Sequence, residues 1–133
     1  MDSLFVTKLR ASAAIDNMAG EVRRRFITDV SGQSAVYTIK LQEATKYVAD
    51  HAANSATAIP GPHLVAEAAA TDRSVLTVAQ NIVALGSAWL TVSSPAIEAA
   101  RIGGKTRVEA AALVEDVIAE RDAALDVLNA ILP

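Results

Sequence analysis

Apolar residues in this chain recur every three or four positions, and nowhere do apolar and polar residues alternate strictly over six or more positions. A repeat of three to four is that of one face of an α-helix, whereas strict alternation is that of a half-buried strand. The β-branched residues are scattered within the helical stripes. The sequence therefore predicts an all-α fold, a small bundle of four to five helices.

Capping residues, glycines and prolines divide this pattern into segments. A first amphipathic helix is expected over about residues 3–28, followed by a loop at 29–33 in which Gly32 sets the turn. A second helix is expected over about 34–53, then an irregular linker at 54–62. A short third helix follows at 62–71 with Pro62 at its first position, and a fourth begins after Ser74, which caps it.

Pro95 interrupts the fourth helix, because proline lacks a backbone donor and clashes with the preceding turn. The helix is expected either to kink there or to stop and restart with Ser94 as its cap. Residues 105–132 are predicted to form one long C-terminal helix after a weak turn at Gly103 and Gly104. This helix is rich in alanine, which gives little free energy on burial. We therefore expect it to project and to pack on another copy or another protein.

Large apolar and aromatic side chains at helical spacing are the predicted core. These are Phe26, Tyr37, Leu41, Tyr47, Ile82, Leu85 and Trp89. A chain of 133 residues is long enough to bury a core without covalent staples. The whole chain, residues 1–133, is therefore expected to be a single helical domain.

Composition excludes several classes of protein. The chain has no cysteine, which rules out disulfide scaffolds and thiolate chemistry. Twelve basic against 15 acidic residues give a net charge of -3, so nucleic acid is a poor partner. No uninterrupted apolar run reaches the roughly 18 residues that span a bilayer, and the first ten residues lack the apolar region of a signal peptide. We expect neither a membrane segment nor export.

Motifs for catalysis or for metal and cofactor binding are incomplete. His51 and His63 flank the linker without a third ligand at metal-site spacing. The stretch from Gly103 to Thr106 ends like a phosphate-binding loop, but Ala99 stands where its first glycine belongs. The five carboxylates between Glu115 and Asp126 are spread around one helix, as on a solvated face. We expect no enzyme, no metal and no cofactor.

The cations at the end of the first helix suit the negative end of its dipole, and they offer a contact for the acidic final helix of a neighbouring copy. A homo-oligomer is therefore expected. The predicted protein-interface residues are Arg23, Arg24, Arg25, Leu113, Val117, Leu128 and Ile131.

The order of several short sequence motifs resembles that of a small helical module of tailed-bacteriophage proteins, which are tail-fibre-associated or uncharacterised virion proteins. In chain order, these motifs and single residues are Glu21, Arg23-Arg24-Arg25-Phe26-Ile27-Thr28, Gly32-Gln33, Tyr37, Lys40, Glu43-Ala44, Tyr47, Glu67-Ala68, Ala79, Ile82, Trp89, Ile97-Glu98, Arg101 and Lys105. The resemblance covers most of residues 15–112. Pro95 departs from the family pattern, which has one continuous helix there.

This resemblance implies a structural role and brings no catalytic residues. The expected function is a structural component of a tailed-phage virion, associated with the tail or baseplate and made in the host cytoplasm. Its expected partners are other phage structural proteins. An alternative is a tail assembly factor or chaperone that is absent from the mature particle. A third reading is a small regulatory protein that binds a host factor or DNA.

Overall fold

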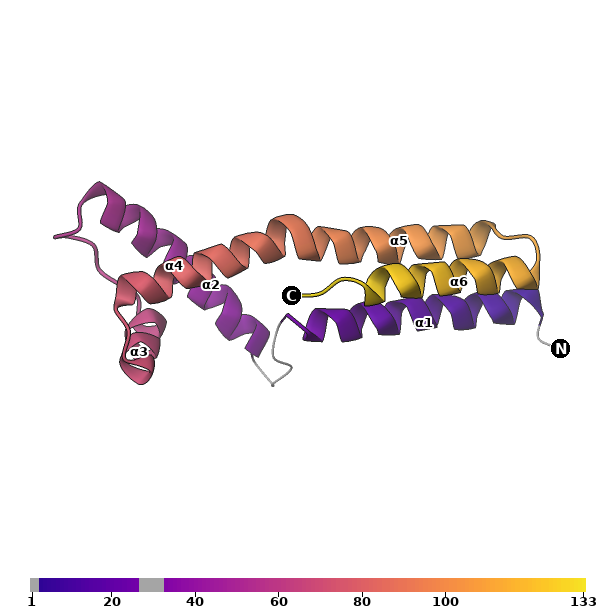
Figure 1. Ribbon diagram of the computed structural model, residues 1–133, viewed down its shortest axis with the longest axis horizontal. Coiled ribbons are helices and arrows are strands. Elements are labelled where there is room, and N and C mark those ends of the chain that lie inside the picture. Colours follow the sequence, from indigo (N-terminus) through magenta and orange to yellow (C-terminus); the bar gives the residue numbers. More distant parts are fainter. Residues whose placement is uncertain (1–2, 27–32) are drawn as a thin grey trace. The chain divides into compact units, whose positions relative to one another are not determined.

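The computed structural model describes residues 3–26 and 33–133, and every regular element in these ranges is a helix (Figure 1). The prediction of an all-α fold is confirmed. The predicted loop at 29–33, with the turn assigned to Gly32, lies outside the described residues except for Gln33.

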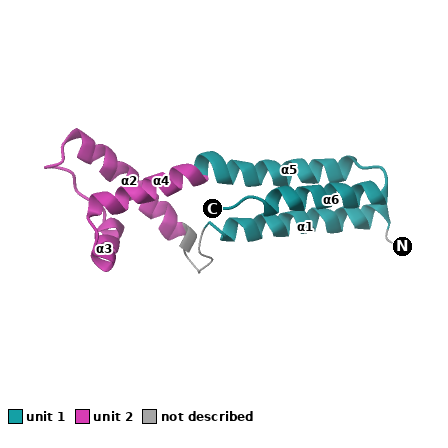
Figure 2. Cartoon of the chain, in the orientation of Figure 1, with its two compact units in different colours: residues 1–28, 90–133 teal, residues 29–89 magenta. Residues whose placement is uncertain are grey.

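The chain divides into two compact units, where the sequence analysis expected one domain (Figure 2). Unit 1 combines residues 1–28 with residues 90–133, and unit 2 consists of residues 29–89. Unit 1 is therefore built from two segments that are distant in sequence, with unit 2 inserted between them.

Unit 1 is a bundle of three helices, α1 (Leu4–Arg24), α5 (Ser94–Ala110) and α6 (Val114–Asn129). Figure 1 shows α1 and α6 running in one direction and α5 in the other. Ser3 caps α1 by accepting a hydrogen bond from the amide of Val6 at 3.1 Å. The core consists of aliphatic residues and alanines: Ala11, Ile15, Ala19, Val22, Ile97, Ala100, Val108, Val117, Ala124 and Leu128.

The predicted helix over residues 105–132 is divided in two by a reversal. The first part ends with α5 at Ala110, the backbone of Ala111 is extended, and α6 begins after Leu113. Glu115 and Asp116 lie in the first turn of α6, where carboxylates suit the positive end of the helix dipole. The helix α6 therefore packs on α1 and α5 instead of projecting.

Unit 2 contains α2 (Gln33–Ala53), α3 (Pro62–Thr71) and α4 (Val75–Ala88). The bounds predicted from Pro62 and from the Ser74 cap are confirmed, and the amide of Thr77 donates to the hydroxyl of Ser74 at 3.1 Å. No helix occupies 54–61, as predicted. The core is the cluster of Ala44, Leu64, Ala68, Val78, Ala79 and Ile82.

A π-helical turn, η1 (Trp89–Ser93), joins α4 to α5 without a non-helical residue. Pro95 cannot donate a hydrogen bond, and its ring would clash with the carbonyl of Thr91 in a regular α-helix. The wider π turn, which ends two residues before Pro95 and includes Thr91, takes up this conflict. The helix therefore continues through Pro95 with a local change of its hydrogen-bond pattern.

The predicted core is corrected at most of its positions. Of the seven large residues chosen, only Ile82 is buried, and Leu85 is 69% exposed. The remaining five, Phe26, Tyr37, Leu41, Tyr47 and Trp89, are half-buried. Small side chains at the helix contacts bring the backbones close together. The narrow space between them has room for aliphatic side chains but not for aromatic rings, which lie at the edges.

Counted as one helix, Val75–Ala110 is the only segment among the described residues that is long and apolar enough to cross a membrane by length and composition. Its most apolar window has a mean hydropathy of 1.5, and 22% of that window is buried. This segment contains no uninterrupted apolar run of roughly 18 residues, so the sequence did not predict a membrane segment here.

Candidate interaction surface and pocket

All seven predicted interface residues lie in unit 1, and they differ in how deeply they are buried. Val117 and Leu128 are fully buried in the core of unit 1. They therefore stabilise their own chain and do not reach a partner, which corrects this part of the prediction. Leu113 is exposed and Ile131 is half-buried.

The arginine triplet forms contacts within the chain. Arg23 donates to the carboxylate of Glu98 at 2.9 Å. Arg25 donates from Nη1 to the carbonyls of Asn129 and Ile131 at 2.9 and 3.2 Å, and from Nη2 to the Asn129 side chain at 2.7 Å. Carbonyls at a helix end have no partner within the helix, so Arg25 caps the C-terminus of α6. The expected contact was between the arginines and acidic side chains of the final helix of a neighbouring copy. Arg25 instead meets carbonyls and an amide of its own chain, and Arg23 pairs with Glu98 of α5.

A network of ion pairs joins α1 to α5. Lys105 and Arg101 donate to the two oxygens of Asp16 at 2.8 and 3.0 Å. The hydrogen bond from Lys105, supported by Arg101, lowers the pKa of Asp16 although partial burial opposes this. Arg101 also donates to Glu98 at 2.7 Å and lowers the pKa of that carboxyl. Both acids are thus held ionised, which suits a structural role and not proton transfer.

A groove runs between α1 and α5 on the outside of unit 1. Ser12 from α1 and Ile102, Lys105 and Thr106 from α5 line it, and its volume is about 520 Å³. Phe5 and Leu9 precede Ser12 by seven and three residues, so they continue the same stripe of α1. Phe5 is 70% exposed, Leu9 57% and Ile102 48%.

We call Phe5, Leu9, Ser12, Ile102 and Thr106 the α1/α5 face. None of these five residues was among the predicted interface residues. The available signal was that Phe5 and Leu9 are large, apolar and four residues apart, yet lie off the stripe of Ala11 and Ile15 that the core uses.

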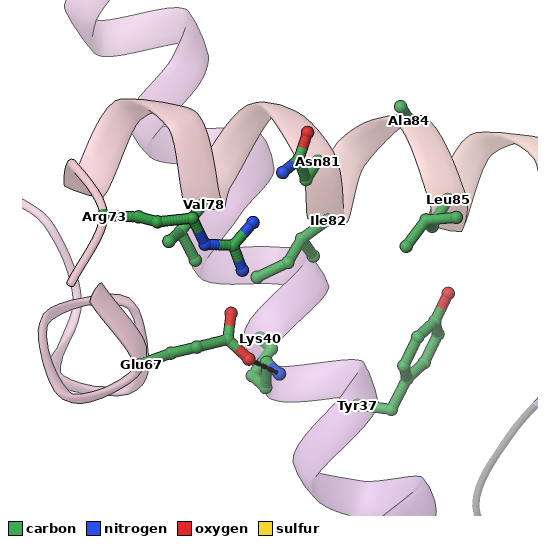
Figure 3. Close-up of a pocket in the computed structure, with 9 residues that line it drawn as sticks. All are labelled: Tyr37, Lys40, Glu67, Arg73, Val78, Asn81, Ile82, Ala84 and Leu85. Atoms are coloured by element: carbon green, nitrogen blue, oxygen red, sulfur yellow. Dashed lines mark hydrogen bonds and ion pairs between the residues drawn. The ribbon is translucent and has the colours of Figure 1, made fainter. Parts of the chain in front are cut away.

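Unit 2 has its own pocket, between α2, α3 and α4, with a volume of about 470 Å³ (Figure 3). Lys40 from α2 and Glu67 from α3 form an ion pair of 2.5 Å at its base. Arg73 reaches in from the α3–α4 loop, and Val78 and Ile82 form the wall on α4. Burial raises the pKa of the Tyr37 phenol, which lies at the opposite end of the pocket from Arg73 (Figure 3).

His63 has a structural role. The Glu43 carboxylate accepts a hydrogen bond from the backbone amide of His63 at 2.9 Å, and its other oxygen contacts the His63 ring. Glu43 thereby caps α3, whose N-cap residue, Gly61, offers no side chain. Within residues 3–26 and 33–133, no group of three or more metal-ligating side chains could hold an ion.

Comparisons with protein families, with curated proteins and with solved structures give no match for this chain.

Proposed function

We propose that this chain is a non-enzymatic helical protein that acts by binding another protein chain through the α1/α5 face. The observation that carries this proposal is the exposure of Ile102 in the groove and of Phe5 and Leu9 on the stripe of α1 that continues from Ser12. Large apolar side chains that gather on the surface of a folded domain are typical of protein interaction sites. The ionised network of Asp16 and Glu98 offers no competing catalytic arrangement.

A second copy of the chain is the partner that we favour. Self-association was expected because the final helix lacked support, but α6 buries Val117, Ala124 and Leu128 in the core of unit 1. Exposed apolar side chains occur on all three helices of unit 1: Phe5 and Leu9 on α1, Ile102 on α5, and Ile118 and Val127 on α6. The groove lies between α1 and α5, so the proposed contact moves to these two helices. Two copies that apply the same face to each other would cover Phe5 and Leu9 of both chains, as in an isologous dimer.

The finer proposal is a structural part of a tailed-phage virion, in the tail or baseplate. This proposal is supported by the resemblance of the sequence motifs Arg23–Thr28, Gly32-Gln33 and Glu43-Ala44 to those of the phage module. A helical protein that acts through surface contacts suits this role. A tail assembly factor that leaves the particle would share the same surface, and a small regulatory protein that binds a host factor or DNA is the third candidate.

Light scattering coupled to size-exclusion chromatography tests the α1/α5 face. We expect the wild-type chain to elute as an oligomer and the double variant Phe5→Ser, Leu9→Ser as a monomer with unchanged helix content. The control is Ile59→Ser, which removes an even more exposed apolar side chain from the linker of unit 2 and should leave the oligomer intact. A wild-type monomer at every concentration, or a double variant with wild-type mass, would refute the proposed face.

Quantitative mass spectrometry of density-purified particles beside the crude lysate tests the virion proposal. A fixed copy number per particle is expected for a structural part. Presence in the lysate alone would contradict the virion role and favour the assembly factor or the regulator.

A further inference from the structure

The charges in the pocket of unit 2 do not balance. Lys40 and Glu67 neutralise each other across 2.5 Å. Arg73 adds a second cation, so the three charged side chains sum to one positive charge. Two cations and one anion leave room for one negative charge, which a ligand could supply.

The guanidinium of Arg73 has hydrogen-bond donors available for an anionic ligand. Its Nε donates to the hydroxyl of Thr71 at 3.3 Å, while its two terminal nitrogens have no partner among the described residues. Figure 3 shows these nitrogens on the pocket side of the loop, in front of the α4 wall. A planar guanidinium with free parallel donors matches a carboxylate in two-point geometry.

The rest of the lining suits an apolar body. Val78, Ile82 and Leu85 form one wall, and Leu85 is largely exposed although it was expected in the core. Tyr37 and Asn81 each provide a polar group from the lining, on α2 and α4. Small-molecule sites combine such an apolar wall with a few placed polar groups, and about 470 Å³ lies within their usual range of about 300 to 1,000 Å³.

We infer that this pocket binds a small organic monocarboxylate, whose carboxylate pairs with Arg73 and whose apolar body lies against Val78 and Ile82. A monoanion fits better than a phosphate dianion, because only one positive charge is uncompensated. The inference concerns unit 2 alone and does not depend on the proposed assembly through unit 1.

The test is an NMR titration of the full chain, with phenylbutyrate as the probe and its neutral amide, phenylbutanamide, as the matched control ligand. We expect phenylbutyrate to shift backbone amides of unit 2 around Arg73 and α4 and to bind at least about tenfold more tightly than the amide, which is one charge-assisted interaction. Arg73→Gln should weaken binding of the acid by a similar factor and leave the amide unaffected.

Two further variants make the test decisive. Arg121→Gln removes an arginine that pairs with Asp122 in unit 1, and it should bind phenylbutyrate like the wild type. Leu85→Glu places a negative charge at an exposed pocket position and should abolish binding without unfolding the chain. Equal affinity for acid and amide, unchanged affinity in Arg73→Gln, shifts spread over unit 1, or no binding at all would each overturn the inference.

Discussion

Two neighbouring glycines in α5 have opposite structural roles. A Cβ at Gly104 would lie 2.6 Å from the Cβ of Ala124, so Gly104 lets α5 and α6 approach closely. A Cβ at Gly103 would meet only the end of the flexible Arg107 side chain, at 3.2 Å. From the sequence, both glycines are expected to weaken one turn of the helix. That description suits Gly103, whereas Gly104 is required by packing.

Alanine substitutions should therefore shift stability in opposite directions. Gly104→Ala should lower the free energy of unfolding by about 1 to 3 kcal/mol, because the added methyl group overpacks the contact with α6. Gly103→Ala should raise it by up to about 1 kcal/mol, because alanine favours the helix. Urea unfolding followed by circular dichroism measures both. Shifts of the same sign would contradict the packing role of Gly104.

At the scale of elements, α1 and α5 are held together by charges at their edge as well as by their aliphatic core. Asp16, Glu98, Arg23, Arg101 and Lys105 form one connected network between the two helices. Each pair is partly exposed, so single pairs contribute little, and the network acts mainly by fixing which residues of α1 face α5.

This network predicts a dependence of stability on pH. The pKa of Asp16 is below its ordinary value of 3.8 in the folded chain, and that of Glu98 is below 4.5. The stabilisation is therefore complete above these ordinary values and is lost as the pH falls through the lowered ones. Urea midpoints measured from neutral to acidic pH should fall in this acid range. Asp16→Asn should lower the neutral-pH midpoint and flatten the fall.

Asp126→Asn is the matched control, because the Asp126 side chain lies on the exposed side of α6 and forms no ion pair among the described residues. It should keep the wild-type pH profile. An identical profile for Asp16→Asn would show that the network contributes nothing to the acid sensitivity.

The elements that could be predicted from the sequence are those with local signals. Pro62 and Ser74 mark helix starts by their own backbone chemistry, and both were placed correctly. The reversal at Ala111–Leu113 contains neither proline nor glycine. It depends on the burial of Val117 and Leu128 against helices distant in sequence, which no local pattern reveals.

In the candidate sites too, features with a local sequence signal could be predicted, whereas contacts between distant residues could not. The charges of Arg23 and Arg25 were recognised, but their partners, Glu98 and Asn129, lie more than 70 residues away. The pocket of unit 2 needs Lys40, Glu67 and Arg73 from three different segments. Their side chains meet only after α2, α3 and α4 have packed, so spacing along the chain carried no signal.

At the scale of the whole molecule, the long apolar helix Val75–Ala110 serves both units. Val78, Ala79 and Ile82 belong to the core of unit 2, and Ile97, Ala100 and Val108 to that of unit 1. Insertion into a bilayer would uncover Leu64 and Ala44 and would carry Arg101 and Lys105 into or across the lipid. The protein packing of this helix therefore competes with a membrane position.

We expect the folded chain to stay in the aqueous fraction when it is floated with phosphatidylcholine vesicles. The variant Leu64→Asn, which places an amide in the core of unit 2, should loosen α4 and increase the floated fraction. Flotation of the wild-type chain with the vesicles would contradict this expectation and would make the apolar helix a membrane element.

The insertion of unit 2 into unit 1 has a consequence for synthesis on the ribosome. All segments of unit 2 emerge in one stretch, whereas α1 is made first and α6 last. The ends of these two helices, Arg24 and Asn129, are 105 residues apart. At roughly 5 to 20 residues per second, the face of α1 that carries Ile15 and Val22 waits about 5 to 20 s for the part of its cover that α6 supplies. During that interval a nascent chain would present α1 to chaperones, while unit 2 already has all of its contacts.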